Sequence, residues 1–504
     1  MMKFDLPRAT GPHGPAARVG RLQLAGRAAL DTPNFLANTS RGAIPHVTPD
    51  LVAQHMRIGG VYLALEDFYE KKEEEKKKTK KNVGEAGVIP ILQTPPTPLH
   101  ARPLHAFTAT PPCLVTVLGP RRFPPVATPV GNTQDDMAIF TARGYQPLKV
   151  TDYRDAVRAL RPDIAVPPAD LSNASFSTKT LQSKRTTRMV DRTDEWTKAW
   201  LDDDDDDDDD DNGRVATFAP VLPIGYSLQC EYLDRLATDY APAAHDPSRR
   251  ASLAGLALYD ADVLPHLQDA HPNLTLLPRL ALGAPASPHD VLRQVALGLD
   301  LFLLPFLNSV SDGGVALTFT FPPPPPPPPP AAGGRTLLPL GIDMSSPAHS
   351  RDPGPLLPGC ACYACTAHHR AYVHHLLHAR EMLGWTLLQL HNHTLAAAFF
   401  AGIRAALLAG GDSAAGFEAA RARFAAAYEP DLPVGTGERP RARGYHFKSE
   451  PGDGKRNHRP WGRMGDRMGE GRSQNSQVET PLRPDDEGTQ ELGVASGSSN
   501  HRAL

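Results

Sequence analysis

The sequence predicts an α/β protein with a parallel sheet covered by helices, because short apolar runs alternate with helix-like segments in its second half. The apolar runs lie at 216–224, 253–259, 274–283 and 300–306, and the helix-like segments at 230–240, 261–271 and 287–298. Continuously apolar runs are typical of strands that are buried on both faces, as parallel strands connected by helices are. A closed barrel and an open doubly wound sheet both satisfy this pattern, so periodicity alone leaves the two architectures open.

Two of these elements carry further local signals. The stretch 153–171 predicts a helix followed by a strand. In the segment 287–298, Ser287 is suited to the N-cap, Pro288 to the first helical position and Gly298 to the residue after the helix end. No glycine-rich phosphate loop follows any predicted strand, which excludes the P-loop and dinucleotide-binding classes.

Three low-complexity stretches interrupt the chain of 504 residues. We expect insertions at 70–87, 202–212 and 322–334, which contain a Lys/Glu-rich run, ten consecutive aspartates and nine consecutive prolines. The charged runs cannot bury enough apolar surface to order themselves, and the prolines favour an extended spacer. We therefore predict one domain over 1–431 and, from its richness in Gly, Pro, Arg and Ser, a disordered tail over 432–504.

Composition predicts a cytoplasmic protein without an integral membrane segment. The N-terminus has no apolar signal region, no run of 18 apolar residues occurs, and the five cysteines do not form a secreted disulfide pattern. The formal net charge is −3 because of the aspartate run, and the rest of the chain carries about +7. A mildly basic protein of this kind is compatible with a polyanionic partner.

Three of the five cysteines lie within six residues and predict a metal site. Cys360, Cys362 and Cys365 form a Cys-x-Cys-x-x-Cys pattern, which suits zinc in a reducing compartment better than chance clustering of surface thiols. A fourth ligand is needed, and the candidates are His368, His369, His374, His375, His378, His391 and His393. If His391 is the ligand, the chain must reverse at Gly384 or at the turn before it, because a straight helix from His368 to His391 would be about 35 Å long.

The segment "CACYACTAHHRAYVHHLLHAREMLGWTLLQLHN" resembles the zinc-binding segment of the tRNA-guanine/queuine transglycosylases. The cysteine pattern, "RAYVHHL", "GWTLL" and the final His-Asn all match, and His391 lies 26 positions after Cys365, as in that family. The resemblance implies one structural Zn²⁺ ion bound by Cys360, Cys362, Cys365 and His391. It also implies a (β/α)8 TIM-like barrel with a zinc-binding subdomain at about 352–410.

The same resemblance implies that this chain lacks catalytic residues. Active members attack the ribose with the second aspartate of an Asp-x-x-Asp strand end, whereas here Asp300 matches the first aspartate and Leu303 occupies the nucleophile position. A leucine cannot form the covalent ribosyl intermediate. The family's "SGGFQ" and "VQGG" segments are also absent, and Ala169 or Asp170 takes the position of the base-reading aspartate.

The resemblance therefore implies an accessory, non-catalytic subunit that pairs with a catalytic paralogue and binds tRNA. The expected heterodimer exchanges guanine for queuine at the wobble position of tRNAs with GUN anticodons, in the cytoplasm or bound peripherally to the mitochondrial outer membrane. Two alternatives stay open: an active transglycosylase that uses Asp300 or Asp312, and a zinc-containing RNA-binding scaffold. The basic stretch 437–463, with its interleaved aromatic residues, is either an RNA contact or a solvated tail.

Overall fold

The computed structural model describes the chain in eleven segments. They comprise residues 2–6, 17–69, 89–126, 128, 131–141, 144–171, 184–203, 215–241, 253–324, 337–409 and 414–440. The three predicted insertions lie largely outside these residues, as does the predicted tail beyond residue 440. All the elements below belong to one compact unit that spans Met1–Gly452.

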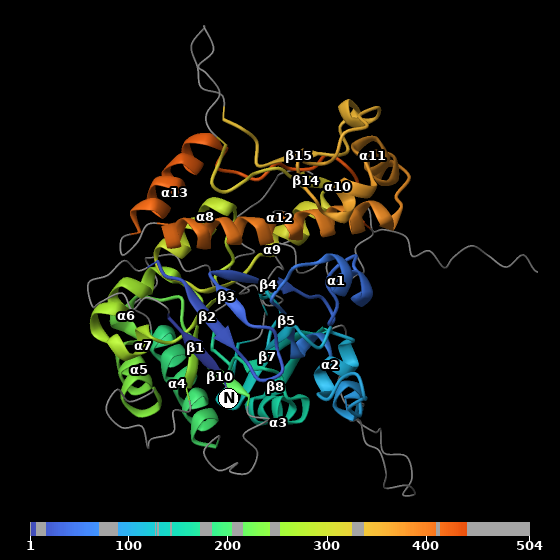
Figure 1. Cartoon of the computed structure of the whole chain (residues 1–504). Helices are drawn as coiled ribbons and strands as arrows, with labels where there is room; N and C mark the ends of the chain where they lie inside the picture. Colours follow the sequence, from blue (N-terminus) through green and yellow to red (C-terminus); the bar gives the residue numbers. More distant parts are fainter. Residues whose placement is uncertain are drawn as a thin grey trace, which may run out of the picture. The chain divides into compact units, whose positions relative to one another are not determined.

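Eight parallel strands close into a barrel, which confirms the (β/α)8 architecture (Figure 1). The strands are β4 (Asn34–Asn38), β5 (Gly60–Ala64), β6 (Val115–Gly119), β9 (Ile164–Ala165), β10 (Ala216–Val221), β11 (Leu253–Leu258), β12 (Arg279–Ala281) and β13 (Leu301–Leu303). Closure is made by β13 and β4, where Leu301 pairs with Asn34 and Leu303 with Leu36. Because the strands are buried, most of their residues are apolar, and the polar exceptions include Asn38, Thr116 and Arg279.

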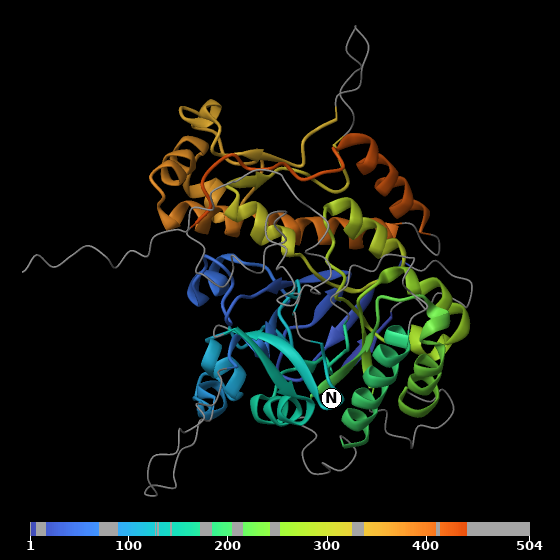
Figure 2. The ribbon, with the colours of Figure 1, turned by 180° about the vertical axis from the view of Figure 1, so that it is seen from behind.

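Helices surround the barrel, and short turns of 3-10 or π helix complete the connections (Figures 1 and 2). The helices are α1 (Pro49–His55), α2 (Pro103–Thr108), α3 (Val150–Leu160), α4 (Lys184–Asp203), α5 (Cys230–Arg235), α6 (Leu264–Ala270), α7 (Pro272–Thr275), α8 (Pro288–Ala296) and α9 (Pro305–Asp312). The 3-10 turns are η1 (Leu65–Asp67), η2 (Pro90–Gln93), η3 (Tyr226–Leu228), η5 (Ala261–Val263) and η6 (Pro347–His349), and η4 (Leu236–Tyr240) is a π turn.

Several predicted elements differ in part from the structure. The predicted helix 261–271 divides into η5 and α6, and the apolar run 300–306 passes into α9 at Pro305. The first residues of the predicted strand 274–283 are helical, because Pro272 begins α7, and only Arg279–Ala281 form a strand. Leu274 is buried in either conformation, so its apolar character could not distinguish them. The predicted helix 230–240 divides into α5 and the π turn η4.

An antiparallel sheet closes the amino end of the barrel. It contains β1 (Lys3–Asp5), β2 (Gly20–Gln23) and β3 (Leu30–Thr32). Leu22 and Leu30 of this sheet pack in the same apolar cluster as the interior residues of the barrel strands. A separate hairpin, β7 (Asp136–Thr141) with β8 (Gly144–Lys149), is inserted between β6 and α3.

A second layer lies over the barrel and contains the cysteine cluster. It consists of the β14 (Val315–Leu317) and β15 (Gly341–Asp343) pair with α10 (Tyr363–Ala367), α11 (Arg370–His378), α12 (Met382–Ala409) and α13 (Ala415–Ala427). Figure 1 shows α12 lying lengthwise on the side of this layer that faces the barrel, where it contacts β4 and α9 of the barrel and β14 of the layer.

The helix α12 is long and apolar enough to span a membrane by length and composition alone. Half of its most apolar window is nevertheless buried inside the structure, and Phe399, Phe400 and Ile403 pack in the main apolar core. This is the pattern of a core helix, so the hydropathy of α12 carries no argument for a membrane span.

Candidate metal centre and the barrel mouth

The four residues predicted as metal ligands lie together. Their ligand atoms are all within 4.8 Å of one another, although His391 is on α12 and the cysteines are on and before α10. His391 Nδ1 is 3.8 Å from the sulfur of Cys360, 3.5 Å from that of Cys362 and 3.4 Å from that of Cys365. In a tetrahedral zinc site with the usual bond lengths, sulfur and nitrogen are about 3.6 Å apart. The donor set and its spacing therefore fit a closed Cys3His metal site.

A chain reversal between α11 and α12 brings His391 to the cysteines. α11 ends at His378, and Arg380 adopts a left-handed conformation with φ of 58° before α12 begins. The reversal thus lies in the turn before Gly384. Gly384 itself is within α12, where an added Cβ would lie 3.1–3.2 Å from Leu376 and Leu377, so its lack of a side chain allows α12 to approach α11 closely.

The His-Asn pair at the end of the motif attaches β14 to α12. His391 Nε2 donates to the Leu317 carbonyl at 2.9 Å, which leaves Nδ1 for the metal. The neighbouring Asn392 accepts from the Leu317 amide at 2.9 Å and donates to the Val315 carbonyl and to Ser311. Since His391 and Asn392 are fully buried, each polar atom needs such a partner.

The electrostatics of the cluster also suit a cation. Hydrogen bonds from Cys362 and Cys365 lower the pKa of the Cys360 thiol, and the same contact with Cys360 raises the pKa of Cys362. Burial lowers the pKa of His391, but Cys360 and Cys365 more than offset this effect and raise it to about 9. Three sulfurs and an imidazole at this distance thus share protons, which a bound divalent cation would displace.

Leu303 is the last residue of β13 and points into an apolar barrel interior. Its side chain is fully buried and belongs to a cluster with Leu36, Tyr62, Phe123 and Leu282. The carboxyl ends of the strands are where parallel barrels carry their catalytic groups. At this end of β13 the chain has an aliphatic side chain among other apolar ones.

Phe123 fills the barrel mouth and is held there by hydrogen bonds. Asn38 at the end of β4 donates to the Phe123 carbonyl at 2.5 Å, and Tyr62 on β5 donates to the Arg121 carbonyl at 2.8 Å. Only 6% of Phe123 is exposed, and its ring lies edge-on to Tyr62 with 6.4 Å between the centroids. The segment after β6 therefore places a buried aromatic side chain in the same apolar cluster as Leu303.

A buried ion pair fixes the same segment. Glu66, just after β5, accepts from the backbone amide and the Nε of Arg122 at 2.7 and 2.8 Å, and from the Phe140 amide at 3.0 Å. Burial raises the pKa of Glu66, and Arg122 opposes that effect. Sequence analysis did not find Phe123 or Glu66, because Phe123 lies in an irregular segment and Glu66 in the short 3-10 turn η1, and neither segment has a periodic pattern.

Asp300 lies at the other end of β13 and has a structural role. It is fully buried, and its carboxylate accepts from Arg18 at 3.0 and 2.5 Å and from the Arg279 amide at 2.9 Å. Asp300 precedes the strand while Leu303 ends it, so the two residues face opposite ends of the barrel. Asp300 thus connects Arg18, which precedes β2 of the amino-end sheet, to Arg279 on the barrel strand β12.

Replacing Asp300 by asparagine tests that structural role. We expect Asp300→Asn to lower the free energy of unfolding by about 2 kcal/mol, because the neutral amide pairs less strongly with the buried Arg18. Chemical denaturation measures this change. An Asp300→Asn protein that unfolds at the same denaturant concentration as the wild-type chain would contradict the structural role.

The other candidate carboxylates are also bound to neighbouring groups. Asp312, at the end of α9, accepts from His46 Nε2 at 2.6 Å. Asp170 accepts from Asn132 at 2.6 Å and from Arg192, while Ala169 is buried in the main apolar core. At the position expected for the base-reading aspartate, the polar residue is therefore Asp170. Both of its carboxylate oxygens already accept hydrogen bonds.

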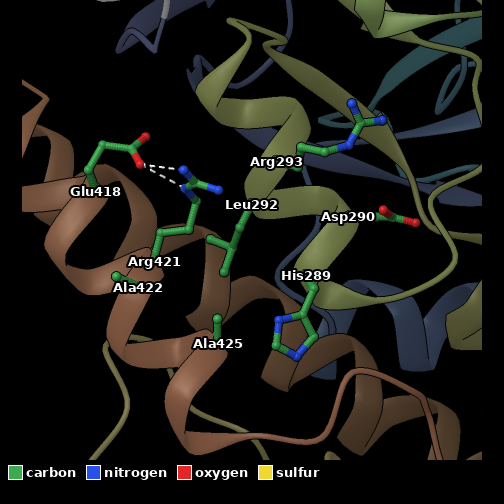
Figure 3. Close-up of a pocket in the computed structure, with 8 residues that line it drawn as sticks. All are labelled: His289, Asp290, Leu292, Arg293, Glu418, Arg421, Ala422 and Ala425. Carbon is green, nitrogen blue, oxygen red and sulfur yellow. Dashed lines mark hydrogen bonds and ion pairs between the residues drawn. The ribbon is translucent and has the colours of Figure 1, made fainter.

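A groove between α8 and α13 lies on the outer wall (Figure 3). Its lining residues are His289, Asp290, Leu292, Arg293, Glu418, Arg421, Ala422 and Ala425. Arg421 donates to Glu418 at 2.8 and 2.6 Å, and His289 contacts the Glu429 carbonyl. The groove contains none of the predicted site residues and none of the residues at the barrel mouth.

Comparison with known proteins gives consistent results. A sequence profile of the family described as queuine tRNA-ribosyltransferase matches residues 14–430. The chain is 32% identical to the queuine tRNA-ribosyltransferase accessory subunit 2 of Schizosaccharomyces pombe, over 83% of both chains. It is 28% identical to the protein of the same name from Drosophila pseudoobscura pseudoobscura, over 80% of this chain and 88% of that protein. It is 27% identical to the protein of the same name from Anopheles gambiae, over 80% of this chain and 86% of that protein.

Proposed function

Because this chain belongs to the queuine tRNA-ribosyltransferase family, we propose that it is the non-catalytic, accessory subunit of a tRNA-guanine transglycosylase complex. In this proposal the complex exchanges guanine for queuine at the wobble position of tRNAs with GUN anticodons. The observation that carries the proposal is Leu303 at the carboxyl end of β13, buried in the same apolar cluster as Phe123. The names of the similar proteins support the same role.

The proposed partner is a catalytic member of the same family, with which this chain forms a heterodimer that binds tRNA. A carboxylate nucleophile has to reach the ribose and leave again, and only a chain with an open mouth and an aspartate at that position can provide one. This chain contributes interface and RNA-backbone contacts, which position a substrate without performing the reaction. We propose the cytoplasm as its location, with any attachment to the mitochondrial outer membrane being peripheral.

The proposed metal is one structural Zn²⁺ ion bound by Cys360, Cys362, Cys365 and His391. Four protein ligands leave no coordination position for water, so this ion stabilises the fold and performs no chemistry. Its ligands connect the segment before α10 to α12, and through Leu317 the centre is connected to β14. The metal would thus hold together the layer that covers the barrel.

Reconstitution with a catalytic subunit tests the proposed function. We expect the isolated chain to incorporate no labelled guanine or queuine into tRNA, and the mixture with the catalytic subunit to be active and to co-elute as one complex in gel filtration. The catalytic subunit alone is the matched control. Turnover by the isolated chain would refute the non-catalytic role, and failure of the two chains to associate would refute the accessory role.

A further inference from the structure

Two histidines outside the Cys3His cluster lie one helical turn apart on α11. His374 and His378 have ring centroids 5.2 Å apart with an angle of 31° between the planes. His378 is exposed and His374 is half-buried. Residues at positions i and i+4 of a helix lie on the same face, so both imidazoles are directed to one place on the surface.

A backbone contact orients the ring of His374. Its Nδ1 donates to the Met344 carbonyl at 2.8 Å, so Nε2 carries the lone pair and lies on the other side of the ring. The same arrangement occurs at His391, where one ring nitrogen donates to the Leu317 carbonyl and the other faces the cysteines. A carbonyl that fixes the tautomer in this way is typical of histidines that bind metals.

We propose that His374 and His378 form a second, open site for a divalent transition-metal ion, with water as the remaining ligands. Neutral imidazole nitrogens bind Zn²⁺, Ni²⁺ and Cu²⁺ well, whereas Mg²⁺ and Ca²⁺ prefer oxygen ligands. His378 also lies in the last turn of α11, where the helix dipole favours a cation. With two protein ligands, this site exchanges its ion rapidly, in contrast to the closed Cys3His centre.

Nickel binding to the full-length chain tests the proposal, after the Cys3His centre has been loaded with zinc and free metal removed. We expect calorimetry to show Ni²⁺ binding that weakens at least about tenfold in His374→Asn and in His378→Ala. Asparagine at 374 can still donate to the Met344 carbonyl while lacking Nε2, so the first variant removes the ligand and keeps the contact. His375→Ala removes an adjacent exposed histidine and is the matched control.

The variants must keep their zinc, which metal analysis verifies before the titration. Unchanged Ni²⁺ affinity in His374→Asn and His378→Ala would overturn the proposal, as would equal weakening in His375→Ala. This result does not depend on the proposed role in tRNA modification, because the experiment contains neither tRNA nor a partner chain.

Discussion

Replacing Cys362 by serine is expected to release the metal ion and unfold the layer that contains the Cys3His centre. Cys362 is the buried cysteine of the cluster, and its sulfur lies 3.5 Å from His391 Nδ1. Metal binding in small structural zinc sites contributes on the order of 10 kcal/mol or more, and that binding energy is folding energy. Zinc content should fall from about one ion per chain to almost none. Hydrogen exchange in α10, α11 and β14 should become fast.

The matched control is Cys113→Ser, which alters an exposed thiol outside the cluster. This variant should retain its zinc and the slow exchange of the wild-type chain. A Cys362→Ser protein that kept both its metal and its protection from exchange would show that the cluster does not hold the layer together.

Replacing Leu303 by aspartate is expected to destabilise the barrel without creating activity. The new carboxylate would lie in an apolar interior formed by Leu36, Tyr62, Phe123 and Leu282. An uncompensated buried charge lowers the free energy of unfolding by about 3–5 kcal/mol. The new carboxyl group should therefore stay protonated, or the packing of the barrel should loosen. A protonated acid is a poor nucleophile, and Phe123 would still occupy the mouth.

Leu303→Met is the matched control, since it keeps the volume and apolar character of the side chain. The Leu303→Met substitution should lower the free energy of unfolding by less than about 1.5 kcal/mol. Denaturant unfolding measures both variants, and base exchange by the isolated chains measures activity. A stable Leu303→Asp protein that incorporates guanine would mean that the nucleophile is the only missing part of the active site.

The barrel and the metal ligands could be predicted from the sequence to different extents. The apolar runs predicted parallel strands, and the family resemblance selected a closed barrel over an open sheet. The three cysteines stand out by spacing alone, but His391 was chosen among seven histidines only through the resemblance. Its proximity depends on the turn at Arg380 and on the contact with Leu317, and neither is visible in a sequence pattern.

Other features were missed for identifiable reasons. The helix α4 was not predicted, although Met189, Thr193, Trp196 and Trp200 recur at helical spacing on its buried face. This signal runs directly into the aspartate run, whose first two residues end α4. Phe123 could not be predicted, because its place in the mouth results from hydrogen bonds to residues of distant strands. The first residues of the predicted tail, 432–440, are placed and include Thr436, which donates to Asp343.

The most direct measurement is the identity of the chain that becomes covalently linked to tRNA during the reaction. The proposed complex can be mixed with substrate tRNA, denatured rapidly, and its two chains separated and weighed by mass spectrometry. We expect the ribosyl adduct on the catalytic partner alone, because Leu303 cannot attack the ribose and Phe123 fills the mouth. An adduct on this chain, at any carboxylate, would contradict the account.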